Sequence, residues 1–152
     1  MFDLMNLENS VQLKCDVIGY QFPDSARDNW CLIKAVVKQG EEIFEVVDPA
    51  LEATEIVTLY KWFKCLSSRE LPRFACQSFT EPNLEFEFLA CKEETVRIAI
   101  HLELEMKPEF KLKQFKSISK KWDVVFELTP DDFKSVLTGM EFAMEQFPIR
   151  ES

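Results

Sequence analysis

The sequence contains few glycines and no long run of apolar residues. Three glycines among 152 residues exclude a glycine-rich phosphate-binding loop. A membrane-spanning helix needs about 20 consecutive apolar residues, and Lys and Glu interrupt every apolar run here. The first eight residues carry acids where a secretory signal carries Lys or Arg. We therefore expect a cytoplasmic protein without an export signal or a membrane partner.

Histidine and cysteine are too scarce and too scattered to suggest a metal or redox site. His101 is the single histidine, and the five cysteines, at positions 15, 31, 65, 76 and 91, lie at least 11 positions apart. An odd number at such spacing offers neither a disulfide framework nor a CxxC motif. The sequence thus predicts reduced thiols, no metal and no cofactor.

The remaining composition is that of one folded acidic domain. Hydrophobic residues make up 47% of the chain, which is enough for one core spanning residues 1–152. The net charge of −9 opposes direct binding to nucleic acid. Six lysines between 107 and 121 weakly resemble a nucleic-acid stripe, but a solvated loop between two strands is the simpler interpretation.

Alternating apolar and polar residues predict most of the secondary structure as strands. The period-two segments are 11–17, 30–37, 43–47, 84–88, 96–106 and 122–128. Gly40 can supply the positive φ of a hairpin loop between the second and third of these. In the fifth segment, Val96 to Met106 alternate with polar residues over eleven positions, the strongest strand pattern in the chain.

Two segments change to the spacing of an amphipathic helix. Apolar residues recur every three or four positions in 53–67 and again in 130–147. Thr129 and Pro130 are typical of a helix start. Gly139, within the second helix, suggests a close approach by another part of the chain. Trp30, Trp62 and Trp122 lie in apolar-patterned segments and are expected in the core.

The order of these elements predicts an α+β fold. We expect a mainly antiparallel sheet of about six strands, with two helices packed on one face. Two helices cannot cover both faces of such a sheet, so the other face is a candidate partner surface.

Acidic residues dominate the polar phase of two predicted strands. Glu85 and Glu87 lie on one strand, and Glu103 and Glu105 share the phase of His101 on another. Such a face could serve a small-ligand-binding or enzymatic domain through paired carboxylates around His101. It could equally be a solvated face without chemistry, and no neighbouring nucleophile supports catalysis. We therefore expect no catalytic residues.

Several irregular segments combine turn formers with large aromatic residues. They are Tyr20-Gln21-Phe22-Pro23, Asp28-Asn29-Trp30, Asp48-Pro49-Ala50-Leu51 with Glu55 and Trp62 downstream, Glu81-Pro82-Asn83-Leu84-Glu85-Phe86, Glu105-Met106-Lys107-Pro108 and Phe147-Pro148-Ile149-Arg150. Similar segments occur in the same order in the WapI-like immunity proteins, which this sequence resembles over about residues 10–150. The resemblance implies that the recurring motif residues are architectural.

The resemblance also implies a function. Immunity proteins of this kind bind and neutralise a toxin domain delivered between bacterial cells, often a nuclease. We therefore expect a non-catalytic cytoplasmic protein whose partner is a cognate and basic toxin domain. Acidic side chains would steer such a partner, and the candidate contact residues are Glu85, Glu87, His101, Glu103 and Glu105, with Glu41, Glu42 and Glu45 of the predicted hairpin. The loops from Tyr20 to Asn29 are the next candidate.

Overall fold

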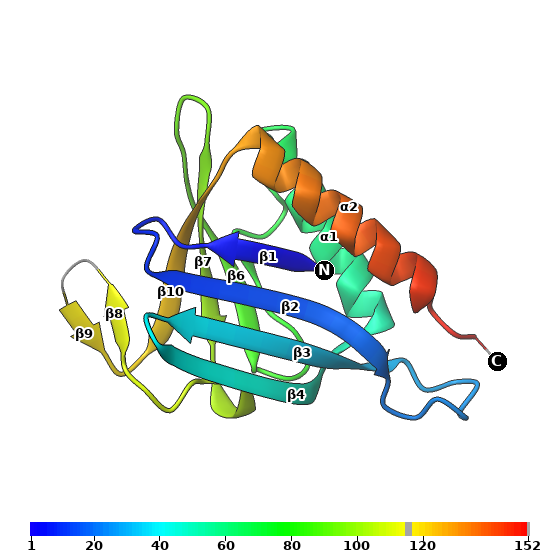
Figure 1. The fold of residues 1–152 in the computed structure, drawn as a ribbon. Coiled ribbons are helices and arrows are strands. Elements are labelled where there is room, and N and C mark those ends of the chain that lie inside the picture. The colour runs from blue at the N-terminus through cyan, green and yellow to red at the C-terminus, as the bar shows by residue number, and fades with distance from the viewer. Residues whose placement is uncertain (115–116, 152) are drawn as a thin grey trace.

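The described residues fold into two four-stranded antiparallel sheets, a small two-stranded hairpin and two α-helices (Figure 1). The computed structural model describes residues 1–114 and 117–151. The first sheet has the order β1-β2-β3-β4. Its strands are β1 (Phe2–Met5), β2 (Val11–Tyr20), β3 (Trp30–Gln39) and β4 (Glu42–Glu52). Gly40 joins β3 to β4 with a φ of 59°, as the hairpin prediction requires.

The second sheet brings together strands that are distant in the sequence. Its order is β10-β7-β6-β5. The strands are β5 (Cys76–Gln77), β6 (Leu84–Cys91), β7 (Val96–Leu102) and β10 (Trp122–Leu128). The Leu7 amide donates to the Val125 carbonyl at 2.9 Å, so the turn after β1 touches β10 and links the two sheets.

The described part of the lysine-rich segment includes paired strands, which the loop interpretation did not predict. It contains a small hairpin of β8 (Leu112–Gln114) and β9 (Ser117–Ser119), while residues 115–116 lie outside the described residues. The side chain of Gln114 donates through Nε2 to the Asp123 carbonyl at 3.1 Å and accepts through Oε1 from the Val125 backbone amide at 3.0 Å. These two bonds attach the hairpin to the edge of the second sheet.

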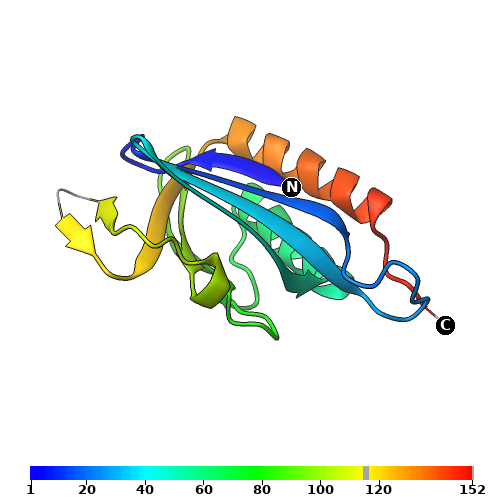
Figure 2. The ribbon, with the colours of Figure 1, turned by 60° about the horizontal axis from the view of Figure 1, so that its bottom comes forward.

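Both helices begin where the sequence predicts. They are α1 (Ala53–Ser67) and α2 (Pro130–Gln146), and they lie side by side (Figures 1 and 2). Before α1, the Glu52 amide donates to Glu55 Oε1 at 2.9 Å. At α2, Thr129 Oγ1 accepts from the Asp132 amide at 3.1 Å, and Asp132 Oδ2 accepts from the Thr129 amide. These bonds satisfy amides that have no partner within the helix.

A single apolar core joins both sheets to both helices. Phe2 of β1, Trp62 and Phe63 of α1 and Phe86 of β6 pack edge-on or tilted against one another. Trp62 and Trp122 are buried, as predicted. The prediction for Trp30 is wrong, because this side chain is half-buried at the mouth of a cavity described below.

The α+β class, the antiparallel pairing and the two helices are confirmed, but three details of the predicted sheet are wrong. The strands form two four-stranded sheets and a small hairpin rather than one sheet of about six strands. β1 was not expected. β7 ends at Leu102, and Leu104–Met106 form a short 3₁₀ turn (η1) instead of continuing the strand. Glu103 and Glu105 therefore do not lie on a strand face.

Candidate functional site

The outer face of the second sheet carries a row of charged side chains. His101 on β7 lies between Glu85 on β6 and Asp123 on β10 in the strand register. Its Nδ1 is 2.6 Å from Asp123 Oδ1, and its Nε2 is 3.7 Å from Glu87 Oε2. Four residues back along β7, Arg97 pairs with Glu127 at 3.2 Å. We call this group the His101 face; its members are Glu85, Glu87, Arg97, His101, Asp123 and Glu127.

The His101 face joins residues that the sequence places together and residues that it does not. Glu85, Glu87 and His101 share one face, as their phases predict. Asp123 was missed, although alternation in 122–128 puts it on the outer side of its strand. Its pairing with His101 depends on β10 lying beside β7, and strand order between distant segments cannot be deduced from local periodicity.

Cys76 is the nucleophilic side chain nearest to these acids. Its Sγ donates a hydrogen bond to Glu85 Oε1. Desolvation, followed by the hydrogen bond and charge of Glu85, raises the pKa of the Cys76 thiol to about 11. The thiol is therefore protonated at neutral pH, and a protonated thiol is a poor nucleophile.

The other predicted contact residues lie away from the His101 face. Glu41, Glu42 and Glu45 are exposed at the β3–β4 hairpin, where Glu45 pairs with Lys34 at 3.1 Å. Glu103 is exposed at the start of η1. Glu105 lies within η1 and turns towards Asn83. The structure thus distributes the eight candidates over three places.

An acidic cavity of about 310 Å³ opens where η1 meets the start of β6 and the middle of β4. Seven residues line it: Gln21, Trp30, Asp48, Pro49, Glu81, Asn83 and Glu105. Asn83 Nδ2 donates to Asp48 Oδ2 at 2.6 Å and lies 3.3 Å from Glu105 Oε2. Burial, then the charge of Glu105 and more weakly that of Glu81, raises the pKa of Asp48, although the Asn83 hydrogen bond opposes this.

A second group of motif residues forms a clamp around the C-terminal segment. Arg150 stacks on the Tyr20 ring with its guanidinium carbon 3.7 Å from the ring centre. The guanidinium donates to the carbonyls of Phe22, Pro23 and Asp28. Asn29 Nδ2 donates to the Arg150 carbonyl at 3.1 Å, and Asn29 Oδ1 accepts from the Arg150 backbone amide at 2.7 Å.

Further motif contacts extend this clamp and anchor the helix α1. The Tyr20 hydroxyl donates to the Pro148 carbonyl, and the Tyr20 ring packs edge-on against Phe147. Glu55 Oε2 accepts from the Thr80 amide at 2.8 Å, next to the exposed residues Glu81 and Pro82. Trp62 Nε1 donates to the Phe74 carbonyl at 3.1 Å. These contacts join segments that are far apart in the chain.

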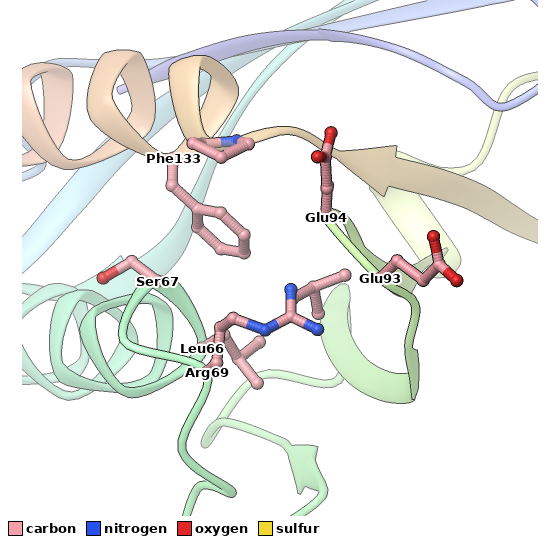
Figure 3. Close-up of a pocket in the computed structure, with 8 residues that line it drawn as sticks. Leu66, Ser67, Arg69, Glu93, Glu94 and Phe133 are labelled. Atoms are coloured by element: carbon pink, nitrogen blue, oxygen red, sulfur yellow. The ribbon is translucent and has the colours of Figure 1, made fainter.

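A larger cavity of about 420 Å³ contains none of the predicted site residues. It lies between the end of α1, the start of α2 and the β6–β7 turn (Figure 3). Arg69 extends across it towards the turn bearing Glu93 and Glu94 and donates to the Lys92 carbonyl. His101, Glu85 and Glu87 line neither this cavity nor the acidic cavity, so no pocket described here converges on His101.

The described residues offer little for metal binding. Among residues 1–114 and 117–151, no group of three or more His, Cys, Asp or Glu side chains is arranged to hold a metal ion. Within the same part of the chain, no helix combines the length and apolar composition needed to cross a membrane.

The chain matches a known protein family. The model of the immunity protein WapI-like family matches residues 4–148, nearly the whole chain. Comparison with curated proteins and with solved structures gives no significant match. The family match covers both sheets, both helices, the His101 face and the acidic cavity.

Proposed function

The chain belongs to the WapI-like immunity protein family, and from this membership we propose that it binds and neutralises a cognate toxin domain in the cytoplasm. Inhibition of this kind requires a binding surface rather than a reaction centre, so the proposal involves no catalytic residue and no cofactor. It also involves no direct contact with nucleic acid or membrane.

The observation that carries the proposed surface is the charge of the His101 face. Four carboxylates, those of Glu85, Glu87, Asp123 and Glu127, share this face with Arg97 and His101. Arg97 and Glu127 neutralise each other at 3.2 Å. The remaining three carboxylates surround one imidazole, and the Glu87 and Asp123 side chains are 36% and 40% exposed. This surface therefore presents a negative field to the solvent.

A negative surface suits a basic partner, and nucleases are a common class of basic toxin because they bind phosphate backbones. Complementary charge accelerates association by long-range steering. Glu103 lies just beyond the end of β7, and the Glu41, Glu42 and Glu45 hairpin adds exposed acids elsewhere. We propose that the His101 face forms the centre of the contact and that these acids contribute to steering.

The test uses a purified candidate toxin domain, sought among the genes that neighbour the gene of this chain. The double variant Glu85→Lys and Glu87→Lys should lower the association rate at low salt at least tenfold, and the loss should shrink as salt screens the field. The variant should no longer protect cells that express the toxin. Glu145→Lys, on the exposed side of α2, is the matched control and should protect fully.

Two results would contradict this proposal. If the wild-type chain neither binds the toxin domain nor protects cells, the neutralising role is wrong. If the double variant associates as fast as the Glu145→Lys control, the role stands but the surface is wrong. Circular dichroism melts of all three proteins establish that a lost interaction does not reflect a lost fold.

A further inference from the structure

Three carboxylates line the acidic cavity, and its described lining includes no basic side chain. The three are those of Asp48, Glu81 and Glu105. No ion pair to these three carboxylates is found among residues 1–114 and 117–151. Burial and the charges of Glu105 and Glu81 raise the pKa of Asp48. Like charges held this close repel one another, and a cation between them would relieve that repulsion.

Asn83 supplies an independent sign of an unfilled site. Its side chain lies between Asp48 and Glu105, and the residue is 2% exposed. Its side-chain nitrogen donates to the two carboxylates, but its buried Oδ1 finds no hydrogen-bond partner among residues 1–114 and 117–151. Buried polar atoms almost always have partners. Asn83 lines the acidic cavity, and its unpartnered acceptor supports a missing donor at this residue.

Trp30 adds an aromatic surface to the cavity. It is the one tryptophan of the chain that stays half-buried, whereas Trp62 and Trp122 are buried in the core. Its backbone is fixed from both sides, because its amide donates to Asp28 Oδ1 at 2.9 Å and its carbonyl accepts from the Gln21 amide at 2.8 Å. The main chain of Trp30 is therefore fixed beside the cavity that this residue lines.

Aromatic rings and carboxylates together recognise a particular kind of cation. A guanidinium stacks on aromatic faces, offers five N–H donors in a plane and is more weakly hydrated than an ammonium. A small metal ion fits less well, since no group of three carboxylate, imidazole or thiol side chains in the described part of the chain is arranged to ligate one. The cavity, at about 310 Å³, has room for a side-chain head group.

We propose that the cavity lined by Trp30, Asp48, Asn83 and Glu105 receives the guanidinium of an arginine side chain from a protein partner. This inference deepens the proposed function, because the partner it implies is the toxin domain. Asn83 directly precedes β6, two residues before Glu85, so an arginine seated here would lie beside the strand that carries part of the His101 face. The bound guanidinium would bridge the Asp48 and Glu105 carboxylates with Trp30 packed against it.

The test does not need the toxin. Nα-acetylarginine amide is titrated into ¹⁵N-labelled protein while the Trp30 indole and Asn83 side-chain signals are followed by NMR, with Trp30→Phe assigning the indole signal. We expect saturable shifts of both signals. The neutral isostere Nα-acetylcitrulline amide should cause none, and the lysine analogue should bind more weakly. Glu105→Gln should weaken arginine binding about tenfold, as expected for losing a charged hydrogen bond, while Glu145→Gln should leave it unchanged.

Other outcomes would overturn the inference. It is wrong if the arginine probe gives no saturable shift, if citrulline shifts the same signals equally, or if Mg²⁺ or Ca²⁺ alone saturates them and arginine does not. Thermal melts of Glu105→Gln separate lost binding from lost folding. If the probe fails while the toxin is still neutralised, this inference alone fails. If the probe binds but no toxin is neutralised, the cavity remains an arginine site and the proposed function fails.

Discussion

Gly139 on α2 lies against the backbone of Met1. A Cβ built on Gly139 would stand 2.0 Å from the Met1 carbonyl oxygen, a distance that no pair of unbonded atoms tolerates. Met1 cannot easily withdraw, because it is buried and its amino group pairs with Asp16 at 2.8 Å. The glycine permits α2 to pack against the start of the first sheet, which explains its presence inside a helix.

Gly139→Ala should therefore destabilise the protein, although alanine favours helix by about 1 kcal/mol over glycine. We expect the free energy of unfolding to fall by about 1–3 kcal/mol, the usual cost of overpacking. Urea denaturation measures this change. Thr138→Ala, at the exposed neighbouring position, is the control and should be neutral or slightly stabilising. Equal stabilisation by both substitutions would show that Met1 moves away freely.

The Arg150 clamp predicts that lysine cannot replace arginine. Arg150→Lys keeps the charge but loses the planar fork that reaches three carbonyls and stacks on Tyr20. We expect a loss of about 1–3 kcal/mol in unfolding free energy, typical of charge-assisted hydrogen bonds. Arg27→Lys, at an exposed position in the loop that the clamp holds, should change it little. An unaffected Arg150→Lys variant would mean that the clamp contributes no stability.

Local periodicity predicted the helices and most strands, and it failed where the neighbouring strands end. Leu104 and Met106 continue the apolar alternation of 96–102, yet the backbone leaves the sheet after Leu102. In the register, Leu102 faces Leu84, the first residue of β6, and Trp122, the first residue of β10. The paired register ends at Leu102 on both sides, and a single backbone bond, from the Glu103 amide to the Asn83 carbonyl at 3.0 Å, follows it. Leu104 adopts a φ of 50° and is 60% exposed.

The candidate sites depend on proximity between distant segments, which the sequence reveals only in part. The motif segments proved to be neighbours, since Trp30, Asp48, Asn83 and Glu105 come from four of them and line one cavity. If every motif residue is architectural, the Arg150 clamp and this cavity have the same role and cannot be told apart from the sequence. What distinguishes them is how charge is compensated. The Arg150 guanidinium donates to carbonyls of its own loop, whereas the carboxylates of the cavity have no ion pair among residues 1–114 and 117–151.

The three tryptophans should differ in their contribution to stability. Trp62→Ala and Trp122→Ala remove buried rings and should each cost about 3–5 kcal/mol. Trp30→Ala should cost less than about 2 kcal/mol, because the ring is half-buried and does not belong to the core. Chemical denaturation monitored by far-ultraviolet circular dichroism measures all three. A cost for Trp30 equal to that of Trp122 would place its ring in the core.

Removing the charge of Asp48 should stabilise the protein while weakening its binding. The pKa of this carboxyl is raised in the folded state above its ordinary value of 3.8. Folding therefore favours the protonated form, and the ionised form destabilises the fold at every pH above the raised pKa. This penalty disappears as the pH falls below the pKa of the unfolded chain. Asp48→Asn, which keeps an acceptor for Asn83, removes the penalty at neutral pH.

We expect Asp48→Asn to raise the melting temperature at pH 7 and to leave it unchanged near pH 3, where the wild-type carboxyl is also neutral. The gain at pH 7 should be about 1 kcal/mol or less, because solvent reaches the cavity and screens the charges. Asp3→Asn is the control, since Asp3 is exposed on β1 and lies outside the cavity. If Asp48→Asn instead lowers the melting temperature at pH 7, the ionised carboxylate is already compensated. In that case the cavity has no need of a cation from a partner, and the repulsion invoked for the arginine site does not exist.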